Sequence, residues 1–423
     1  MNFVKKIGKN WLTKKLEKQV KKLRKKHVFL VVAVVGSVGK TSTKLAIAEM
    51  LKTQKSVRYQ EGNYNDRLTV PLVFFGHDNP NMFNVFAWLK IFRSNRKQIR
   101  RKHFYDVVVL ELGTDGPGQL KDFEYINPDI SVVTAVTPEH MEFFDSIDAV
   151  ADEELAVTKF SKKVIVNVDD VSPKYIKNIK NLTTYGLQKA DYMASISTKK
   201  NKQLINVSRS DLSINKEISL LGMQGAKVAL AALAVANELD LTQANILNGL
   251  GHLKAFSGRM NILDGINKST IIDDTYNSSP AAVTAGLDVL YAMKAPQKIA
   301  ILGTMNELGK FSDDAHKEIG KYCDPKQLDM VVTIGKLAEE FTAKVAKQKG
   351  CQVHSFDSPY DAGDFVKSRL VKGAVVFAKG SQNRVFAEES LKVLLADRDD
   401  EKKLVRQSKY WLDIKEGQFG RRS

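Results

Sequence analysis

The chain has 423 residues, which is enough for two or three domains with ordinary cores. Hydrophobic residues make up 43% and charged residues 27%, a composition typical of a soluble globular protein. Its two cysteines, Cys323 and Cys351, exclude a disulfide framework and lack metal-ligand spacing, so we expect a cytoplasmic protein.

The N-terminal 27 residues carry eleven Lys or Arg and one acid, Glu17, so they hold +10 of the net charge of +17. Their apolar residues recur at helical spacing, which predicts a basic amphipathic helix over residues 1–27. These residues are Val4, Ile7, Trp11, Leu12, Leu16, Val20 and Leu23. The helix is too charged for a secretory signal and too interrupted to span a bilayer. Contact with an anionic membrane, peripheral at its inner face, and packing on the protein itself are equally favoured; specific nucleic-acid binding is not expected.

A glycine turn follows an apolar run at 28–35, which predicts a buried parallel strand, and precedes a predicted helix at 41–52. The turn reads Gly36-Ser37-Val38-Gly39-Lys40-Thr41-Ser42-Thr43. Backbone N–H groups and a helix N-terminus in such a turn bind phosphate, Lys40 adds a positive charge, and the Thr41 hydroxyl can ligate Mg²⁺. Val34 replaces the first glycine of the usual loop, yet the context favours a nucleoside triphosphate site over a plain turn with an exposed lysine.

A second basic stretch follows an apolar run at residues 82–92. Its basic residues are Arg93, Arg96, Lys97, Arg100, Arg101 and Lys102. The run is too short to span a membrane. It fits either a helix lying in the membrane interface or a buried helix with a basic end, and the buried helix is the default prediction.

Short β-branched runs at 107–110, 130–135 and 164–167 predict further strands. Glu111 follows the first of these, where α/β sheets keep their ligands, and is a candidate Mg²⁺ ligand or water organiser rather than a solvent-facing carboxylate. His140 follows the second, and we weigh a structural and a catalytic role for it equally.

The alternation resumes after a long helix at 222–239 and a predicted hinge at 256–259. Strands are predicted at 271–272, 299–302, 330–334 and 374–378, and helices at 281–293, 313–322, 337–349, 360–370 and 384–395. This pattern predicts an α/β fold with doubly wound, mostly parallel sheets. Asn277, close to a proline-started helix, fits an amide offered to a base edge or a helix cap. The charged end, 397–423, is expected to be irregular but to dock through Val405, Tyr410, Trp411 and Leu412.

Together these segments resemble the Mur ligase family of ATP-dependent amide-forming ligases, most closely the members that attach D-alanyl-D-alanine to a UDP-linked muramoyl tripeptide in peptidoglycan biosynthesis. The resemblance rests on residues 36–43, 61–65 with Pro71, 110–113, 140–144, 167–170, 258–260, 273–280, 302–309, His316 and 379–381. It implies four segments: a basic helix (1–27), a central P-loop ATP-binding domain (28–257), a C-terminal Rossmann-like domain (258–396) and a tail (397–423).

The resemblance also implies a mechanism with ATP and Mg²⁺ as cofactors. ATP phosphorylates a substrate carboxylate to an acyl phosphate, an amine attacks it, and domain closure excludes water. Lys40 would hold the β- and γ-phosphates, Thr41 and Glu111 one Mg²⁺, and His140 a second. The remaining nucleotide contacts would be Gly36, Ser37, Gly39, Ser42, Arg259 and Asn277. The substrate-side residues would be Asn63, Asn65, Asn306, Glu307, His316, Lys379 and Ser381.

Two departures from the family pattern stand out. Where the family usually carries a carbamylated lysine that steadies the second metal, this chain has Glu154, beside Glu153. We expect Glu154 to supply that carboxylate; the alternative is an exposed helical acid pair, with Lys159 unrelated. The second departure is that only a basic segment of about 27 residues precedes the ATP-binding strand, where these relatives carry a UDP-sugar-binding domain. The substrate is then held differently, is another acyl compound, or is membrane-associated.

Three functions remain open from the sequence. The leading one is a monomeric carboxylate–amine ligase of cell-wall type that uses a peptide precursor and an amino-acid or dipeptide amine. The second is a related ligase for a polyglutamate or lipid-linked precursor. The third is a nucleotide switch or membrane scaffold, against which His140 and residues 379–381 argue because a switch needs no amine site.

Overall fold

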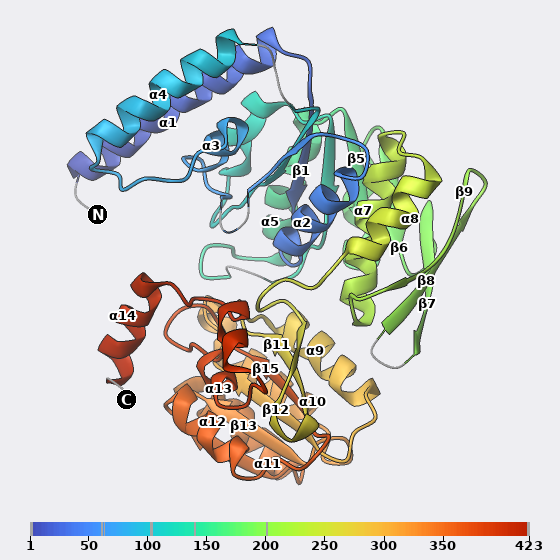
Figure 1. Cartoon of the computed structure of the whole chain (residues 1–423), viewed down its shortest axis with the longest axis vertical. Helices are drawn as coiled ribbons and strands as arrows, with labels where there is room; N and C mark the ends of the chain where they lie inside the picture. Colours follow the sequence, from blue (N-terminus) through green and yellow to red (C-terminus); the bar gives the residue numbers. More distant parts are fainter. Residues whose placement is uncertain are drawn as a thin grey trace. The chain divides into compact units, whose positions relative to one another are not determined.

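The computed structural model describes residues 3–60, 62, 64–101, 105–138, 141–199 and 202–420. The chain forms two compact units (Figure 1). The N-terminal unit comprises Met1–Pro138, Phe143–Ser219 and Gln224–Lys254. The C-terminal unit comprises Glu139–Glu142, Leu220–Met223 and Ala255–Ser423. None of the described helices combines the length and the apolarity needed to cross a lipid bilayer.

The N-terminal unit is built on one sheet with the described strand order β2-β3-β1-β4-β5-β6-β7-β8-β9. Its strands are β1 (Leu30–Val35), β2 (Val57–Arg58), β3 (Val107–Glu111), β4 (Ile130–Val133), β5 (Lys163–Asn167), β6 (Leu182–Gly186), β7 (Tyr192–Lys199), β8 (Lys202–Arg209) and β9 (Leu212–Ile218). The strands from β2 to β7 pair in parallel, and β7, β8 and β9 pair antiparallel. The buried run Val31–Val35 explains why β1 takes a central position in the parallel part.

Helices pack around this sheet. They are α1 (Phe3–Lys26), α2 (Lys40–Leu51), α3 (Val70–Phe75), α4 (Val85–Arg100), α5 (Ile147–Glu154), α6 (Pro173–Ile176), α7 (Gly222–Glu238) and α8 (Gln243–His252), with 3₁₀ turns at Leu120–Ile126 and Leu155–Phe160. The alanines of α7 are buried from Ala226 to Ala236 and let this helix approach its neighbours closely.

The C-terminal unit is a second, six-stranded sheet among the described residues, ordered β10-β11-β15-β12-β13-β14. Its strands are β10 (Asn261–Asp264), β11 (Thr270–Asp274), β12 (Lys298–Gly303), β13 (Met330–Ile334), β14 (Val353–Phe356) and β15 (Val375–Lys379). Its helices are α9 (Pro280–Ala292), α10 (Ser312–Tyr322), α11 (Lys344–Gln348), α12 (Pro359–Lys367), α13 (Glu389–Lys392) and α14 (Lys409–Phe419), with 3₁₀ or π turns at Ile266–Lys268, Gly309–Phe311, Ala338–Ala343 and Arg398–Lys403. Only β10 runs antiparallel to its neighbour.

Alternate residues of the central strands enter opposite cores of this unit. Ile271 faces the core that contains residues of α12 and α13, whereas Ile272 faces the core that contains residues of α9 and α10. Apolar residues on both faces of the same strands produce the predicted doubly wound arrangement.

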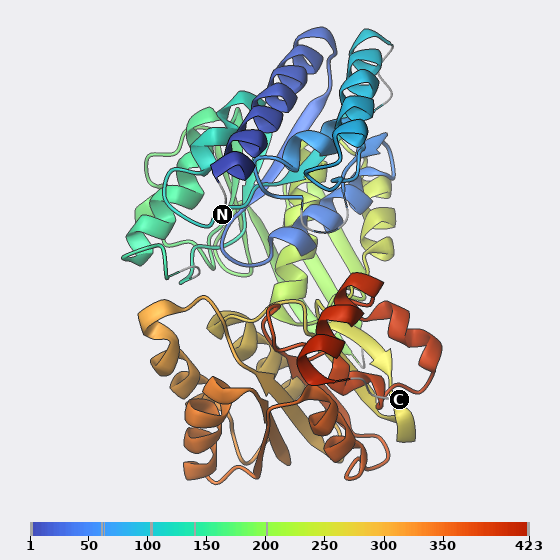
Figure 2. The same cartoon turned by 90° about the vertical axis from the view of Figure 1, so that its left-hand side faces the viewer.

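The expected N-terminal basic helix is present as α1, and part of its predicted apolar stripe packs on the protein itself, whereas Trp11 is exposed. Leu12, Leu16, Val20 and Leu23 are buried. α1 and α4 lie side by side in the N-terminal unit (Figures 1 and 2).

Three expectations about local structure were wrong. The predicted helix at 384–395 shrinks to α13, because Arg384 and Phe386 have left-handed backbones (φ 65° and 49°) that a right-handed helix cannot contain. The expected irregular end contains α14; of the residues expected to dock, Val405 is buried, whereas Tyr410 and Leu412 are exposed. The apolar run at 82–92 is only partly buried, since Phe83 and Phe86 are exposed.

Candidate functional site

The predicted phosphate loop joins β1 to α2 at the carboxyl end of the parallel strands. Gly36 has φ 121°, and a Cβ there would lie 2.4 Å from Thr134 Oγ1, so only glycine fits. Thr134 Oγ1 donates to the carbonyl of Val38, which ties the loop to β4. The Lys40 ammonium lies over the loop, 2.5 Å from the Gly36 carbonyl oxygen. The loop thus places a lysine beside the start of α2, an arrangement that suits a phosphate.

Thr41 and Glu111 meet beside this loop. β3 pairs in parallel with β1, placing Glu111 opposite Val34. The Thr41 hydroxyl donates to Glu111 Oε2 at 2.9 Å, and the Lys44 ammonium lies 3.3 Å from the same oxygen. Glu111 is buried, so its alternative as a solvent-facing carboxylate is excluded. A hydroxyl beside a carboxylate is an oxygen donor set that suits Mg²⁺.

Both glutamates at the end of α5 are buried, which excludes the exposed acid pair. Glu154 Oε2 accepts from the backbone N–H of Gly36 at 2.7 Å, so this carboxylate lies against the phosphate loop. Glu153 accepts instead from Thr114 Oγ1 and from the backbone N–H groups of Gly118 and Leu120. Of the two acids, Glu154 alone is hydrogen-bonded to the phosphate loop, and Glu153 anchors the turn after β3.

Two other predicted residues of this region, Asn63 and His140, lie outside the described residues. The described residues contain no cluster of three or more His, Cys, Asp or Glu side chains able to hold a metal. Asn65 is described, and its amide Nδ2 lies 3.4 Å from Glu111 Oε1. Asn65, for which we predict a substrate contact, therefore lies beside the Thr41–Glu111 pair.

In the C-terminal unit, the segment after β11 is held by buried acids. Asp273 accepts from the backbone N–H of Gly258 and from Thr275 Oγ1, and its complete burial raises its pKa to about 6. The Lys379 ammonium contacts Asp274 Oδ2 at 2.5 Å and donates to the carbonyl of Asn277 at 2.9 Å. Burial lowers the pKa of Lys379, and the charge of Asp274 opposes that shift. Lys379 thus fixes the turn that presents Asn277.

Arg259 and Ser278 flank the same turn with buried polar atoms that lack partners among the described residues. These atoms are Arg259 Nε and Ser278 Oγ. The Arg259 guanidinium also lies 4.3 Å over the ring of Tyr276. Because buried polar groups are normally satisfied, the two orphan atoms suit a polar ligand such as a nucleotide.

Asn306 and Ser381 are brought together at the ends of β12 and β15. Ser381 Oγ accepts from the backbone N–H of Asn306 at 2.8 Å. His316 is buried and lies next to this turn: its Nε2 accepts from the N–H of Met305, and its Nδ1 is 2.8 Å from the Ser312 carbonyl. Burial lowers its pKa, in keeping with a neutral ring. Both ring nitrogens are engaged by backbone, so we revise the expected substrate contact of His316 to a positioning role.

Glu307, which follows Asn306, has a left-handed backbone with φ 65°. Its predicted substrate contact, like those of Asn306, Lys379 and Ser381, stays a prediction. Lys379 and Ser381 are each only 1% exposed. Their surroundings would therefore have to rearrange before either side chain could contact a substrate.

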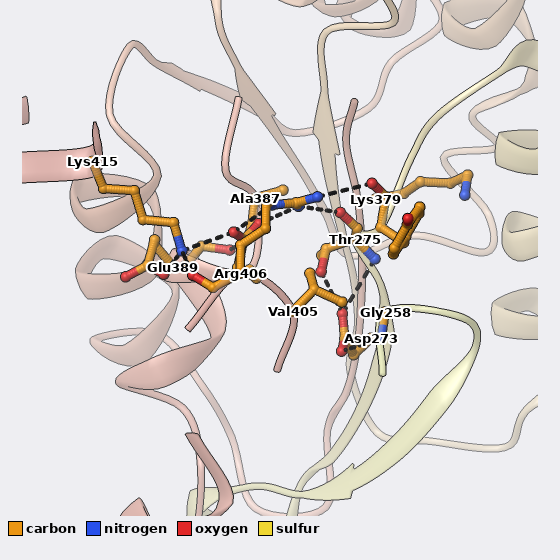
Figure 3. A network of polar contacts seen from close by, with 12 residues as sticks. Gly258, Asp273, Thr275, Lys379, Ala387, Glu389, Val405, Arg406 and Lys415 are labelled. Carbon is orange, nitrogen blue, oxygen red and sulfur yellow. Dashed lines mark hydrogen bonds and ion pairs between the residues drawn. The ribbon is translucent and has the colours of Figure 1, made fainter. Parts of the chain in front are cut away.

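The sequence did not predict a cluster of buried charges that joins the C-terminal tail to the turn after β11 (Figure 3). The Arg406 guanidinium donates to the carbonyls of Thr275 and Tyr276 and to both oxygens of Glu388. The Lys415 ammonium lies 2.9 Å from Glu388 and 2.5 Å from Glu389. Nothing in the local sequence marks these partners, which are 18 to 131 residues apart.

Comparison with known proteins places the two units in one family. The Mur ligase middle domain matches residues 34–236, and the Mur ligase, glutamate ligase domain matches residues 258–382. The UDP-N-acetylmuramoyl-tripeptide–D-alanyl-D-alanine ligase of Bacillus subtilis is 26% identical over 372 residues, covering 85% of this chain and 74% of the relative. The Escherichia coli ligase of the same name is 25% identical over 316 residues, covering 72% and 64%.

Solved structures share the fold. The MurF ligase from Thermotoga maritima, in complex with ADP, has a TM-score of 0.76 at 24% identity and covers 92% of this chain and 84% of that chain. The folylpolyglutamate synthase of the same organism has a TM-score of 0.60 at 16% identity, covering 93% and 95%. The phosphate loop, the strand-end acid and the two matched domains make this chain a member of the Mur ligase family and an ATP-dependent ligase.

Proposed function

We propose that this ligase joins D-alanyl-D-alanine to the terminal carboxylate of a UDP-linked muramoyl tripeptide, in the cytoplasm and as a monomer. The main support is the similarity to ligases of that name, which runs through both domains. The converging Lys40, Thr41 and Glu111 around the phosphate loop suit the phosphoryl transfer that such a ligation needs.

The proposed reaction has two steps. A carboxylate oxygen of the tripeptide attacks the γ-phosphorus of ATP, and ADP leaves. The dipeptide amine then attacks the acyl carbon and loses a proton, and the bond between that carbon and the phosphate oxygen breaks to release phosphate. Lys40 and the loop N–H groups hold the phosphates in line and offset their charge.

Mg²⁺ would be held by Thr41 and Glu111, where it would neutralise phosphate charge. We propose that Glu154 supplies the second carboxylate of the site, together with His140. Its contact with the N–H of Gly36 supports this role, because it places a buried carboxylate against the loop that binds phosphate. Arg259 and Asn277 would contact the nucleotide, and Asn63, Asn65, Asn306, Glu307, Lys379 and Ser381 would serve the substrates.

Phosphate release tests the proposal. With ATP and Mg²⁺, we expect release only when both the tripeptide precursor and D-alanyl-D-alanine are present. Lys40→Met should abolish it, whereas Lys372→Met, at an exposed position, should not. Equal release without the amine would instead indicate a nucleotide switch. A condensed product formed only from a polyglutamate acceptor would move the chain to the second type of ligase.

We also propose peripheral contact with an anionic membrane, through a region that includes residues 1–27. The supporting observation is that eleven of the 65 Lys and Arg residues lie in this short segment. Such contact would bring a membrane-associated or lipid-linked precursor within reach of the same chemistry.

A further inference from the structure

The positive charge of the chain is concentrated in the helix pair α1–α4. α1 contains eleven Lys or Arg and one Glu, and α4 contains five Lys or Arg and no acid. Subtracting the one acid from the sixteen basic residues leaves +15 of the net charge of +17 on these two helices. The rest of the protein is therefore nearly neutral, and the pair is a distinct electrostatic surface.

The two helices run in the same direction, because successive residues of α1 contact successive residues of α4. Trp11 contacts Phe92 with ring centroids 6.1 Å apart, Gln19 donates to the Phe92 carbonyl, and Lys26 donates to the Arg100 carbonyl. Buried polar bonds fix this pairing, since Asn95, which is fully buried, donates to Gln19 Oε1 at 2.8 Å. The pair is thus a defined unit rather than two loose helices.

Apolar side chains are exposed at the N-terminal end of the pair. Phe83 is 71%, Val85 63%, Phe86 87% and Leu89 41% exposed, and Trp11 on α1 is 57% exposed. We call these five residues the apolar tip. Isolated exposed apolar residues are ordinary, but four large ones within residues 83–89, with exposed Trp11 on the neighbouring helix, mark an interaction site.

A basic stripe continues from this tip along α4. Lys90, Arg93 and Lys97 follow Phe86 at helical spacing, all are exposed, and none forms an ion pair among the described residues. The opposite side of α4, with Trp88, is buried against its own protein. The outward side of α4 therefore carries apolar groups at one end and cations along its length.

We propose that the apolar tip and the basic stripe form a docking surface for an anionic lipid bilayer, which rests on the proposed membrane contact and assigns it to particular residues. The tip enters the boundary between headgroups and acyl chains, and the stripe lies on the anionic headgroups. A second copy of the chain is disfavoured because its own +15 helix pair would repel this one. Nucleic acid is disfavoured because it offers no apolar phase for Val85 and Leu89.

Vesicle co-sedimentation of the full chain tests the proposal. The vesicles contain phosphatidylcholine alone or with about 30 mol% phosphatidylglycerol, at about 0.1 M salt. We expect at least about tenfold tighter binding to the anionic vesicles. The stripe variant Lys90→Gln/Arg93→Gln/Lys97→Gln and the tip variant Phe83→Ser/Phe86→Ser should each weaken that binding by at least about tenfold.

Matched controls separate this surface from overall charge and hydrophobicity. Lys344→Gln/Lys347→Gln/Lys372→Gln removes the same charge from exposed sites in the C-terminal unit. Met193→Ser/Val371→Ser removes two other exposed apolar side chains. Both controls should bind anionic vesicles within about twofold of the wild type.

Three outcomes would overturn the inference. Tip and stripe variants that bind as the controls do would leave membrane contact standing but place it elsewhere. Tighter binding to a DNA duplex than to the anionic vesicles, or a dimer by light scattering that the tip variant abolishes, would assign the surface to another partner. If the wild type bound no vesicles, the proposed membrane contact would fail too, while phosphate release with soluble substrates would still test the ligase.

Discussion

Arg406→Ala tests the role of the C-terminal tail. The guanidinium is 5% exposed and Glu388 is fully buried, so the variant removes a cation from a buried carboxylate and from two backbone carbonyls. Removing one partner of a buried ion pair costs about 3–5 kcal/mol. Lys415 remains 2.9 Å from Glu388, so we place the loss of unfolding free energy at about 3 kcal/mol, the lower end of that range.

Urea unfolding followed by Trp411 fluorescence measures this loss. Trp411 packs against Phe386 in the C-terminal unit, and replacing Trp11 and Trp88 by Phe leaves it as the sole tryptophan. Arg398→Ala is the matched control, because Arg398 is an exposed arginine of the same tail, and it should change stability by less than about 0.5 kcal/mol.

A second variant isolates the cause. Arg406→Ala/Glu388→Gln removes the buried charge at position 388, which Lys415 otherwise shares with Glu389, so it should recover about 1 kcal/mol or more of the loss. The Michaelis constant for ATP should also rise in Arg406→Ala, because the turn that presents Asn277 loses two of its bonds. A loss no larger than that of Arg398→Ala would refute this reasoning.

Three further predictions concern the site. Glu154→Gln should lower the rate of ligation by at least about tenfold because the carboxylate beside Gly36 loses its charge, and steady-state kinetics with Asp152→Asn as control would measure it; full activity would contradict the role. Thr41→Ala should raise the Mg²⁺ concentration needed for half-maximal activity, and an unchanged Mg²⁺ titration would count against the Thr41–Glu111 site. Burial raises the pKa of Asp273 from its usual 3.8 to about 6, so the folded protein holds this proton more tightly than the unfolded chain does. The stability that Asp273 contributes is therefore fully present below about pH 4 and is lost as the pH rises through about 6. Urea unfolding should therefore show wild type losing stability relative to Asp273→Asn between pH 4 and 7, whereas a constant difference would show that Asp273 does not titrate there.

The sequence predicted the parts of the fold and site that depend on local pattern. The strand, turn and helix around Lys40 were confirmed, because an apolar run, two glycines and a helix start are all local signals. Glu111 was placed at a strand end from the same reasoning. The antiparallel strands β7 to β9 were missed, although Ile205 and Val207 in β8 show the alternation typical of a half-buried strand.

What could not be predicted depends on contacts between distant residues. The bonds of Arg406 to Thr275 and Glu388 need a folded tail, and no spacing in the sequence encodes them. The partial exposure of 82–92 depends on which side of α4 faces α1. The neutral, inward-facing ring of His316 likewise follows from the turn at Met305.

In the proposed reaction, this chain activates a carboxylate as an acyl phosphate and then forms an amide. The most direct test is a single reaction with ATP, Mg²⁺, D-alanyl-D-alanine and a UDP-muramoyl-tripeptide whose terminal carboxylate carries ¹⁸O, followed by mass analysis of both products. We predict the condensed peptide together with inorganic phosphate that has gained ¹⁸O from the carboxylate. Unlabelled phosphate, or labelled phosphate without a condensed peptide, would contradict the claim.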